Sequence, residues 1–145
     1  MTNRVEAYRR LVADVYELAG ISRETSETLA SEVGQTAARW HVMSAISEQA
    51  LPVPAIARRL GLARQSVQRV IDDLAASGLV TTRPNPEHRR SPLFSLSEEG
   101  QAVTEELFRR SEASRAELLR RARVSTDDLE GARRVLRALV AAFES

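Results

Sequence analysis

Apolar residues follow a helical repeat at the start of the chain. Over the first 19 residues they recur at spacings of three and four positions: Val5, Tyr8, Leu11, Val12, Val15, Leu18 and Ala19. This spacing predicts an amphipathic helix. Gly20 either separates it from a second helix that Ser22 caps, or lies within a single kinked helix. Gly34 is expected to end the region, because glycine favours the position after a helix.

The next part of the chain carries two short helical patterns separated by a glycine. Pro54 suits the first turn of a helix that ends at Leu60, and Gly61 interrupts the pattern. The second pattern places four apolar residues on one face: Val67, Val70, Ile71 and Leu74. It stops before Gly78. Two short helices joined by a tight glycine-containing turn are typical of a helix-turn-helix. A helix capped by Thr36 and carrying Trp40 is expected just before them.

The period of the pattern changes after Gly78. Residues 79–83 and 93–96 resemble short strands, and the segment between them is rich in proline and asparagine. This predicts a two-stranded hairpin. Ser97 then suits the cap of a long helix to about Arg123, which has few apolar residues in its middle. A last helix begins after Ser125, with Asp128 as its capping-box partner. It carries an apolar stripe: Leu129, Ala132, Leu136, Leu139, Val140 and Phe143.

Composition narrows the chemistry that this chain can perform. The length of 145 residues fits one domain. All 21 basic residues are arginine, cysteine is absent, and the two histidines, His41 and His88, lie far apart. Thiolate metal sites, disulfides, lysine Schiff bases and phosphate-loop lysines are therefore excluded. We expect neither an enzyme nor a cofactor. The chain has no membrane-spanning apolar run and no signal-peptide core, so we expect a cytoplasmic protein.

Charge is distributed unevenly along the chain, although the net charge is only +1. Residues 52–92 contain seven arginines and three acidic residues, whereas residues 1–51 and 93–145 carry net charges of −2 and −1. A local basic segment of this kind is typical of a DNA-binding surface. The apolar stripes of the two terminal regions are expected to pack either within one chain or against a second copy. The second copy is favoured, because two-fold dimers are common and a dimer binds two DNA half-sites.

The ordered motifs resemble those of the MarR family of winged helix-turn-helix transcriptional regulators. The resemblance covers about residues 34–100 and comprises the Trp40 helix, IARRLGLARQSVQRVIDDLAASGLV, and then RPNPEHRRSPLFSLSEEG. It implies a mainly α fold with a small two-stranded β-wing. A single domain is expected, with residues 34–97 as the DNA-binding lobe and residues 1–33 and 98–145 as dimerisation helices. The implied function is a homodimeric repressor of a palindromic operator, released by a small aromatic or phenolic effector.

Several positions depart from the family pattern. Pro52 and Val53 replace the usual threonine cap of the first helix of the pair, and Ala63 replaces the serine cap of the recognition helix. The wing has His88 where the family has an aspartate that holds the wing arginine. Either His88 or the prolines of the wing are expected to order this loop. These departures leave an alternative function open, namely a helical protein-interaction module that kept the fold but lost operator binding.

The candidate site residues belong to the recognition helix, the wing and the Trp40 helix. Arginine pairs with guanine and glutamine with adenine in the major groove, which the N-terminal part of the recognition helix is expected to enter. Double-stranded DNA is therefore the expected partner. The predicted DNA-binding residues are Arg64, Gln65, Ser66, Gln68, Arg69, Arg89 and Arg90. Arg90 matches the family's minor-groove arginine, and Arg89 is expected at a phosphate. The ligand-binding candidates are Arg39, Trp40 and His41, with a core role for Trp40 and a structural role for His41 as alternatives.

Overall fold

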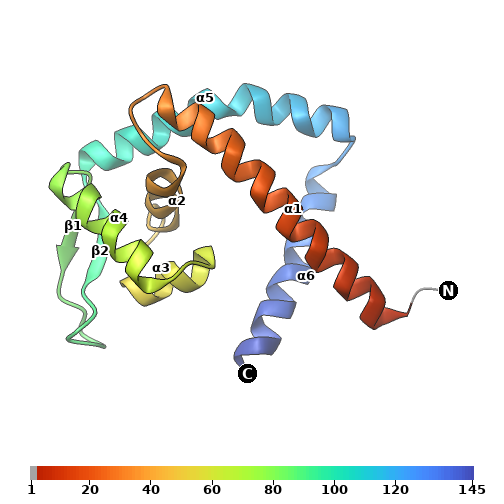
Figure 1. The fold of residues 1–145 in the computed structure, drawn as a ribbon, viewed down its shortest axis with the longest axis horizontal. Coiled ribbons are helices and arrows are strands. Elements are labelled where there is room, and N and C mark those ends of the chain that lie inside the picture. Colours follow the sequence, from red (N-terminus) through yellow and green to blue (C-terminus); the bar gives the residue numbers. More distant parts are fainter. Residues whose placement is uncertain (1–2) are drawn as a thin grey trace. The chain divides into compact units, whose positions relative to one another are not determined.

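The computed structural model describes residues 3–145 (Figure 1). In chain order the elements are α1 (Arg4–Ser31), α2 (Ala37–Ala45), α3 (Val53–Leu60), α4 (Arg64–Ala76), β1 (Val80–Arg83), β2 (Leu93–Leu96), α5 (Glu98–Ala122) and α6 (Thr126–Glu144). The chain divides into two compact units, of which the first ends at Phe108 and the second spans Arg109–Ser145. The boundary therefore falls inside α5. The predicted mainly α fold with a two-stranded wing is confirmed.

The first helix is continuous through Gly20, which resolves the two alternatives that the sequence left open. It begins at a cap in which the Asn3 side chain accepts a hydrogen bond of 2.8 Å from the Glu6 N–H. The Glu6 carboxylate in turn binds Arg10 one turn later, at 2.8 Å. Such pairs four residues apart support an exposed helix. Helix formers on both sides of Gly20 thus outweigh the conformational freedom of one glycine.

The helix-turn-helix forms where the sequence predicts it. Thr36 caps α2 by accepting a hydrogen bond of 3.1 Å from the Arg39 N–H. α3 ends at Gly61, whose φ of 68° lies in the left-handed region that only glycine adopts without strain. α4 starts after Ala63, which has cap geometry but offers no side-chain hydrogen bond. The turn between the helices is therefore set by glycine, and the recognition helix starts without a polar cap.

The wing is an antiparallel hairpin of β1 and β2, paired from Val80–Leu96 to Arg83–Leu93. Leu51 extends the pairing, because its N–H and carbonyl both bond to the main chain of Phe94, at 3.0 and 2.9 Å. The segment before α3 is thereby attached to the wing. The end of the wing leads into α5 through Ser97, whose hydroxyl donates to the Gly78 carbonyl at 2.6 Å and accepts from the Gly100 N–H at 3.0 Å.

The core of the first unit lies among α2, α3, α4 and the wing. Its most deeply buried large side chains include Met43, Ile56, Ile71 and Leu74. Two flanking helices also contribute, since Ala30 of α1 and Leu107 of α5 are fully buried in the same cluster. The core therefore extends beyond residues 34–97. The α1 and α5 segments that carry these two residues are therefore part of the packing of this lobe.

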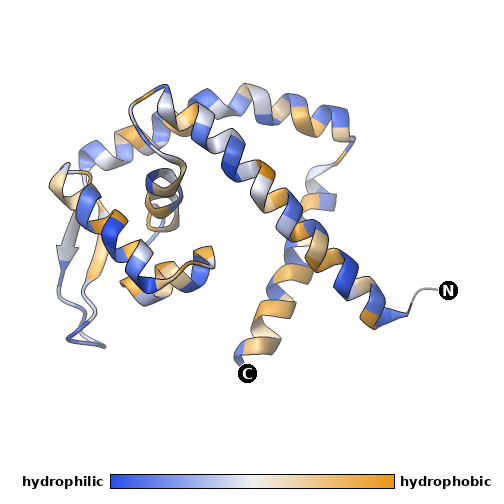
Figure 2. Cartoon of the chain, in the orientation of Figure 1, coloured by the Kyte–Doolittle hydropathy of each residue, from blue (hydrophilic) through white to orange (hydrophobic). Residues whose placement is uncertain are grey.

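Both terminal helices leave apolar side chains exposed. Figure 2 shows hydrophobic colours over most of the C-terminal half of α6, and none of its described residues is buried. Its exposed apolar side chains are Leu129, Val135, Leu136, Val140 and Phe143. α1 likewise exposes Val5, Tyr8, Leu11, Val15 and Leu18. α6 begins at the predicted capping box of Ser125 and Asp128, which exchange hydrogen bonds of 2.9 and 3.0 Å. Within residues 3–145, no helix is long and apolar enough to cross a membrane.

Candidate nucleic-acid interface

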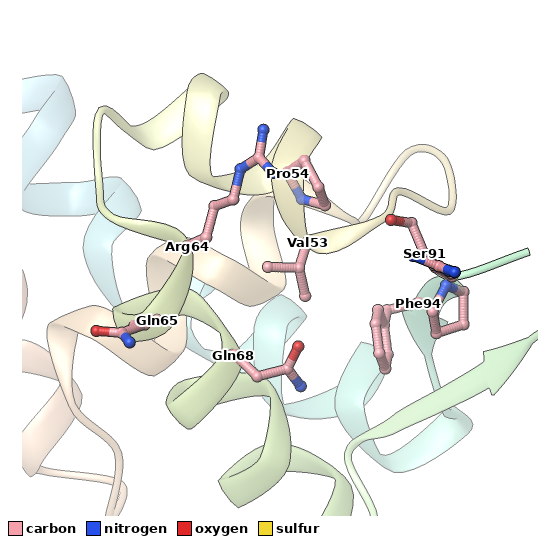
Figure 3. A pocket seen from close by; sticks show the side chains of 9 residues that line it. Val53, Pro54, Arg64, Gln65, Gln68, Ser91 and Phe94 are labelled. Atoms are coloured by element: carbon pink, nitrogen blue, oxygen red, sulfur yellow. The ribbon is translucent and has the colours of Figure 1, made fainter. Parts of the chain in front are cut away.

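A concave surface of about 270 Å³ lies between the start of α3, the first half of α4 and the returning strand of the wing (Figure 3). Its lining residues are Val53, Pro54, Arg64, Gln65, Gln68, Arg90, Ser91, Pro92 and Phe94. Four of these are predicted DNA-binding residues, although Gln68 and Arg90 are separated by 22 positions in the sequence. The floor is apolar, from Val53 and Phe94, and the rim is basic and amide-bearing. The fold thus places the recognition helix and the wing arginine around one hollow.

The orientation of α4 follows from its buried residues. Val67, Ile71 and Leu74 are turned into the core and are at most 1% exposed. Since successive residues of a helix advance by about 100°, the opposite side carries Gln65, Arg69 and Asp72. All three are exposed. We call these three residues the outer face of α4. Arg64 and Gln68 lie on the side of this face toward the wing, where they line the concave surface.

Ser66 and Arg69 are exposed but do not line the concave surface. Arg69 belongs to the outer face, and Ser66 lies on the flank of α4 away from the wing. A duplex lying across the outer face would pass both. The structure therefore gathers Arg64, Gln65 and Gln68 with Arg90, and leaves Ser66 and Arg69 as separate neighbours on the same helix.

The turn of the wing is organised by Asn85, which sequence reasoning missed. Its side-chain Nδ2 donates to the Ser91 carbonyl at 2.9 Å, and its Oδ1 accepts from the Glu87 N–H at 3.0 Å. The main chain adds bonds from the His88 N–H to the Asn85 carbonyl and from the Ser91 N–H to the His88 carbonyl, each 3.2 Å. A signal was present, because asparagine before proline favours a turn closed by its own side chain.

Arg89 and Arg90 lie in the loop that Asn85 closes, and both are exposed. Arg90 directly precedes Ser91, whose carbonyl accepts the Asn85 bond. The side-chain bridge therefore anchors the main chain next to the arginine that reaches the concave surface. An aspartate at the position of His88 is not needed for this anchor. The basic tip has a defined path despite its long, strand-free connection.

The three ligand-binding candidates lie elsewhere in the first unit. Arg39 has only 18% of its side chain exposed and donates to Gln35 Oε1 at 2.8 Å and to Ser77 Oγ at 3.2 Å. Trp40 is 4% exposed and belongs to the hydrophobic core, as its core interpretation predicts. His41 stacks on Trp40 with a ring-centroid distance of 6.4 Å. None of the three lines the concave surface.

Sequence comparisons agree with this architecture. The MarR family model matches residues 33–91, which include α2, α3, α4 and β1 and end in the wing just before β2. An uncharacterized protein of Mycobacterium tuberculosis is 51% identical over 102 residues, covering 70% of this chain and 71% of that protein. The transcriptional activatory protein BadR of Rhodopseudomonas palustris is 28% identical, covering 72% of this chain and 62% of BadR.

Solved structures show the same fold at lower sequence identity. The transcriptional regulator BldR from Sulfolobus solfataricus is 18% identical with a TM-score of 0.77, covering 94% of this chain and 99% of that one. A cysteine-to-serine mutant of MarR from E. coli in complex with operator DNA is 18% identical with a TM-score of 0.67, covering 95% and 99%. Staphylococcus aureus MarR in complex with salicylate and kanamycin is 12% identical with a TM-score of 0.71, covering 94% and 92%. Because it matches the MarR family model and has the helix-turn-helix and wing of the solved MarR structures, the chain belongs to the MarR family of winged-helix transcription regulators.

Proposed function

We propose that this chain binds double-stranded DNA with sequence specificity and regulates transcription as a homodimer. The observation that carries the proposal is the shared concave surface, where Arg64, Gln65 and Gln68 of α4 meet Arg90 of the wing. A protein of the same fold has been crystallised with operator DNA, the MarR of E. coli. The cytoplasm is the proposed place of action.

The side chains of α4 suit the edges of bases in a major groove. A guanidinium donates two parallel hydrogen bonds to guanine, and a glutamine amide both accepts from and donates to adenine. Arg64, Gln65 and Gln68 are the proposed base contacts. Ser66 and Arg69 are proposed to contact phosphate or base from the neighbouring faces of the helix. Their exposure leaves these groups accessible to a duplex.

The wing is proposed to reach the adjacent minor groove. Arg90 is the residue that enters, because the negative potential of a narrow minor groove attracts a guanidinium. Arg89 is proposed to contact phosphate, which positions the protein without reading sequence. The two side-chain hydrogen bonds of Asn85 support both roles, because they hold the loop that carries these two arginines.

Homodimer formation is proposed from the apolar side chains of α1 and α6. Each helix exposes several large apolar residues that water covers in a single chain, such as Leu11 and Val15 in α1 and Leu136 and Val140 in α6. Covering such surfaces stabilises a complex by roughly 25 cal/mol per Å² of apolar area. A two-fold dimer would present two copies of α4 about 34–36 Å apart, one helical turn of DNA, to a palindromic site.

The proposed direction of regulation is repression, by occupying a site that RNA polymerase needs. A small aromatic or phenolic molecule is the proposed effector. It would act by binding more tightly to a dimer whose α4 spacing does not match the operator. Support for an effector comes from S. aureus MarR, which was solved with salicylate and kanamycin. Arg39, Trp40 and His41 remain the proposed contacts.

The test is a selection of bound sequences from random duplexes, followed by fluorescence anisotropy at moderate salt. We expect a palindromic consensus that is bound more tightly than random duplex by roughly a thousandfold or more, as is typical of specific regulators. Arg90→Ala is expected to weaken binding, whereas Arg9→Ala, which removes an exposed arginine of α1, leaves it unchanged. Equal affinity for consensus and random duplex would refute sequence-specific regulation.

The alternative function, a protein-interaction module without operator binding, draws on the missing cap of α4 and the missing wing aspartate. The Asn85 bridge weakens the second argument, because it anchors the wing without that aspartate. A stoichiometric protein partner recovered by pull-down, together with no shift of any duplex, would favour this alternative over DNA binding.

A further inference from the structure

Asp72 lies on the outer face of α4, beside a proposed base-reading side chain. The Gln68 Nε2 donates a hydrogen bond of 2.9 Å to Asp72 Oδ1. The two residues are four positions apart, one turn of the same helix, and both are exposed. Asp72 is thus an acidic residue in direct contact with a side chain that borders the concave surface.

The contact determines which end of the amide points which way. An ionised carboxylate only accepts hydrogen bonds, so the Gln68 atom next to it must be the nitrogen. Turning the amide over would place its oxygen against the carboxylate oxygen, with no hydrogen between them. Gln68 is left with one further N–H and with both lone pairs of Oε1. The hydrogen bond to Asp72 therefore favours one placement of the amide donor and acceptor before DNA arrives.

That arrangement matches one purine better than the other. Adenine presents N7 as an acceptor and N6 as a donor at its major-groove edge, whereas guanine presents two acceptors, N7 and O6. We propose that Asp72 is a specificity-determining positioning residue: by holding the Gln68 amide in one orientation, it makes α4 select adenine over guanine at the base that Gln68 contacts. The inference rests on the proposed function and adds to it the base class and the residue that sets it.

The negative charge of Asp72 is expected to lower the affinity for every duplex, whatever its sequence. A carboxylate on a helix that enters a groove is repelled by the phosphates of any sequence. Removing it should therefore strengthen binding to all duplexes while weakening the preference for adenine. If Asp72 has a purely structural role, its removal should cause neither change. If its role is purely electrostatic, its removal should strengthen binding to all duplexes and leave the adenine preference unchanged. The two readouts together separate these possibilities.

The experiment uses the full chain and the consensus duplex selected by it. Selection with Gln68→Ala identifies the base pair whose preference depends on Gln68. At that pair we expect the intact chain to prefer adenine over guanine by roughly fivefold to a hundredfold, the range of a good bidentate contact. Asp72→Ala is expected to reduce that ratio by about threefold or more and to raise affinity for random duplex. Alanine favours helix, so α4 should be retained, which circular dichroism checks.

Two controls make the result specific. Glu87→Ala removes one exposed negative charge from the wing and is expected to raise affinity for all duplexes without altering the adenine preference. In a Gln68→Ala background, Asp72→Ala should cause no further change of the ratio, because the amide that it positions is gone.

The inference is overturned if Asp72→Ala leaves the adenine-to-guanine ratio unchanged, or changes it equally with and without Gln68. It is also overturned if the position that depends on Gln68 does not prefer adenine. An intact chain with no sequence preference at all would overturn the proposed function, and this inference with it. If the intact chain binds DNA with sequence preference but Asp72→Ala does not change the adenine-to-guanine ratio, only this inference is overturned.

Discussion

Arg39 of α2 donates a hydrogen bond of 3.2 Å to the hydroxyl of Ser77 at the C-terminal end of α4. The same guanidinium donates to Gln35 Oε1 at 2.8 Å and lies 3.9 Å from the Asp73 carboxylate. Ser77 is itself held, since its hydroxyl donates to the Asp73 carbonyl at 3.0 Å. One largely buried arginine therefore connects the link between α1 and α2 to the last turn of the recognition helix.

We expect Arg39→Ala to destabilise the fold and to loosen the end of α4. The free energy of unfolding should fall by about 1.5–3 kcal/mol, as for hydrogen bonds that involve a charged group. Unfolding in urea measures the stability, and hydrogen exchange measures the protection of residues 73–77. Arg39→Lys should retain only part of the stability that Arg39→Ala loses, because an ammonium does not span Gln35 and Ser77 as a planar guanidinium does. Equal stability of all three chains would show that the connection carries no energy.

Asn85→Ala is expected to release the turn of the wing. Its amide closes the loop at both ends, on Ser91 and on Glu87, and alanine supplies neither bond. Exchange of the Glu87 and Ser91 amides should become faster. If Arg90 binds DNA as proposed, affinity for the selected duplex should fall by about threefold to tenfold, in line with one or two lost hydrogen bonds. His88→Ala is the matched control, because the contacts seen for His88 come from its main chain.

Gly100→Ala is expected to be strongly destabilising, although alanine is the better helix former. Gly100 is buried, and a Cβ at this position would overlap the carbonyl oxygen of Leu79, which is backbone and cannot rotate away. We expect the free energy of unfolding to fall by at least about 2 kcal/mol, as measured by urea unfolding. Gly131→Ala in α6 meets only the flexible end of Arg134 at 3.5 Å. That control should instead gain about 0.5–1 kcal/mol, and a gain at both glycines would contradict the packing at Leu79.

Ala63→Ser is expected to stabilise the protein. Ala63 has the extended backbone of an N-cap, with φ −70° and ψ 144°, and no side-chain bond to the first turn of α4. A serine hydroxyl there would accept from a free N–H, a gain of about 1 kcal/mol. The measurement is the midpoint of urea unfolding. Ala63→Val, which cannot cap, should show no such gain, and an equal gain from both substitutions would point to a cause other than capping.

The Asp128 carboxyl is expected to titrate below its usual range. The hydrogen bond from the Ser125 N–H, and then the contact with the Ser125 side chain, hold its pKa down by stabilising the charged form. A lowered folded pKa adds stability above the unfolded value of about 3.9, and that stability disappears as pH falls through the folded pKa. Carboxyl NMR would measure the titration. A midpoint at or above the unfolded value would contradict the capping box.

Local features of the sequence were sufficient to predict the ends of the elements. Thr36 and Ser125 cap helices, and Gly61 ends one, because each acts through hydrogen bonds to residues within three or four positions. The same holds for the capping box of Ser125 and Asp128. Asn85 could have been identified because it directly precedes Pro86, although its bond to Ser91 spans six residues.

The sequence by itself determined the helices, the hairpin, the basic segment and the likeness to the family, because caps, periodicity and charge are short-range properties of the chain. Only the tertiary structure decided that Gln68 and Arg90 line one concave surface, and that Arg39 reaches Ser77 across 38 positions. It also decided that Ala30 and Leu107 complete the core. These relations depend on how several elements pack at once. Many pairings satisfy the same hydrophobic pattern, and the choice among them is made by side-chain fit in the closed core.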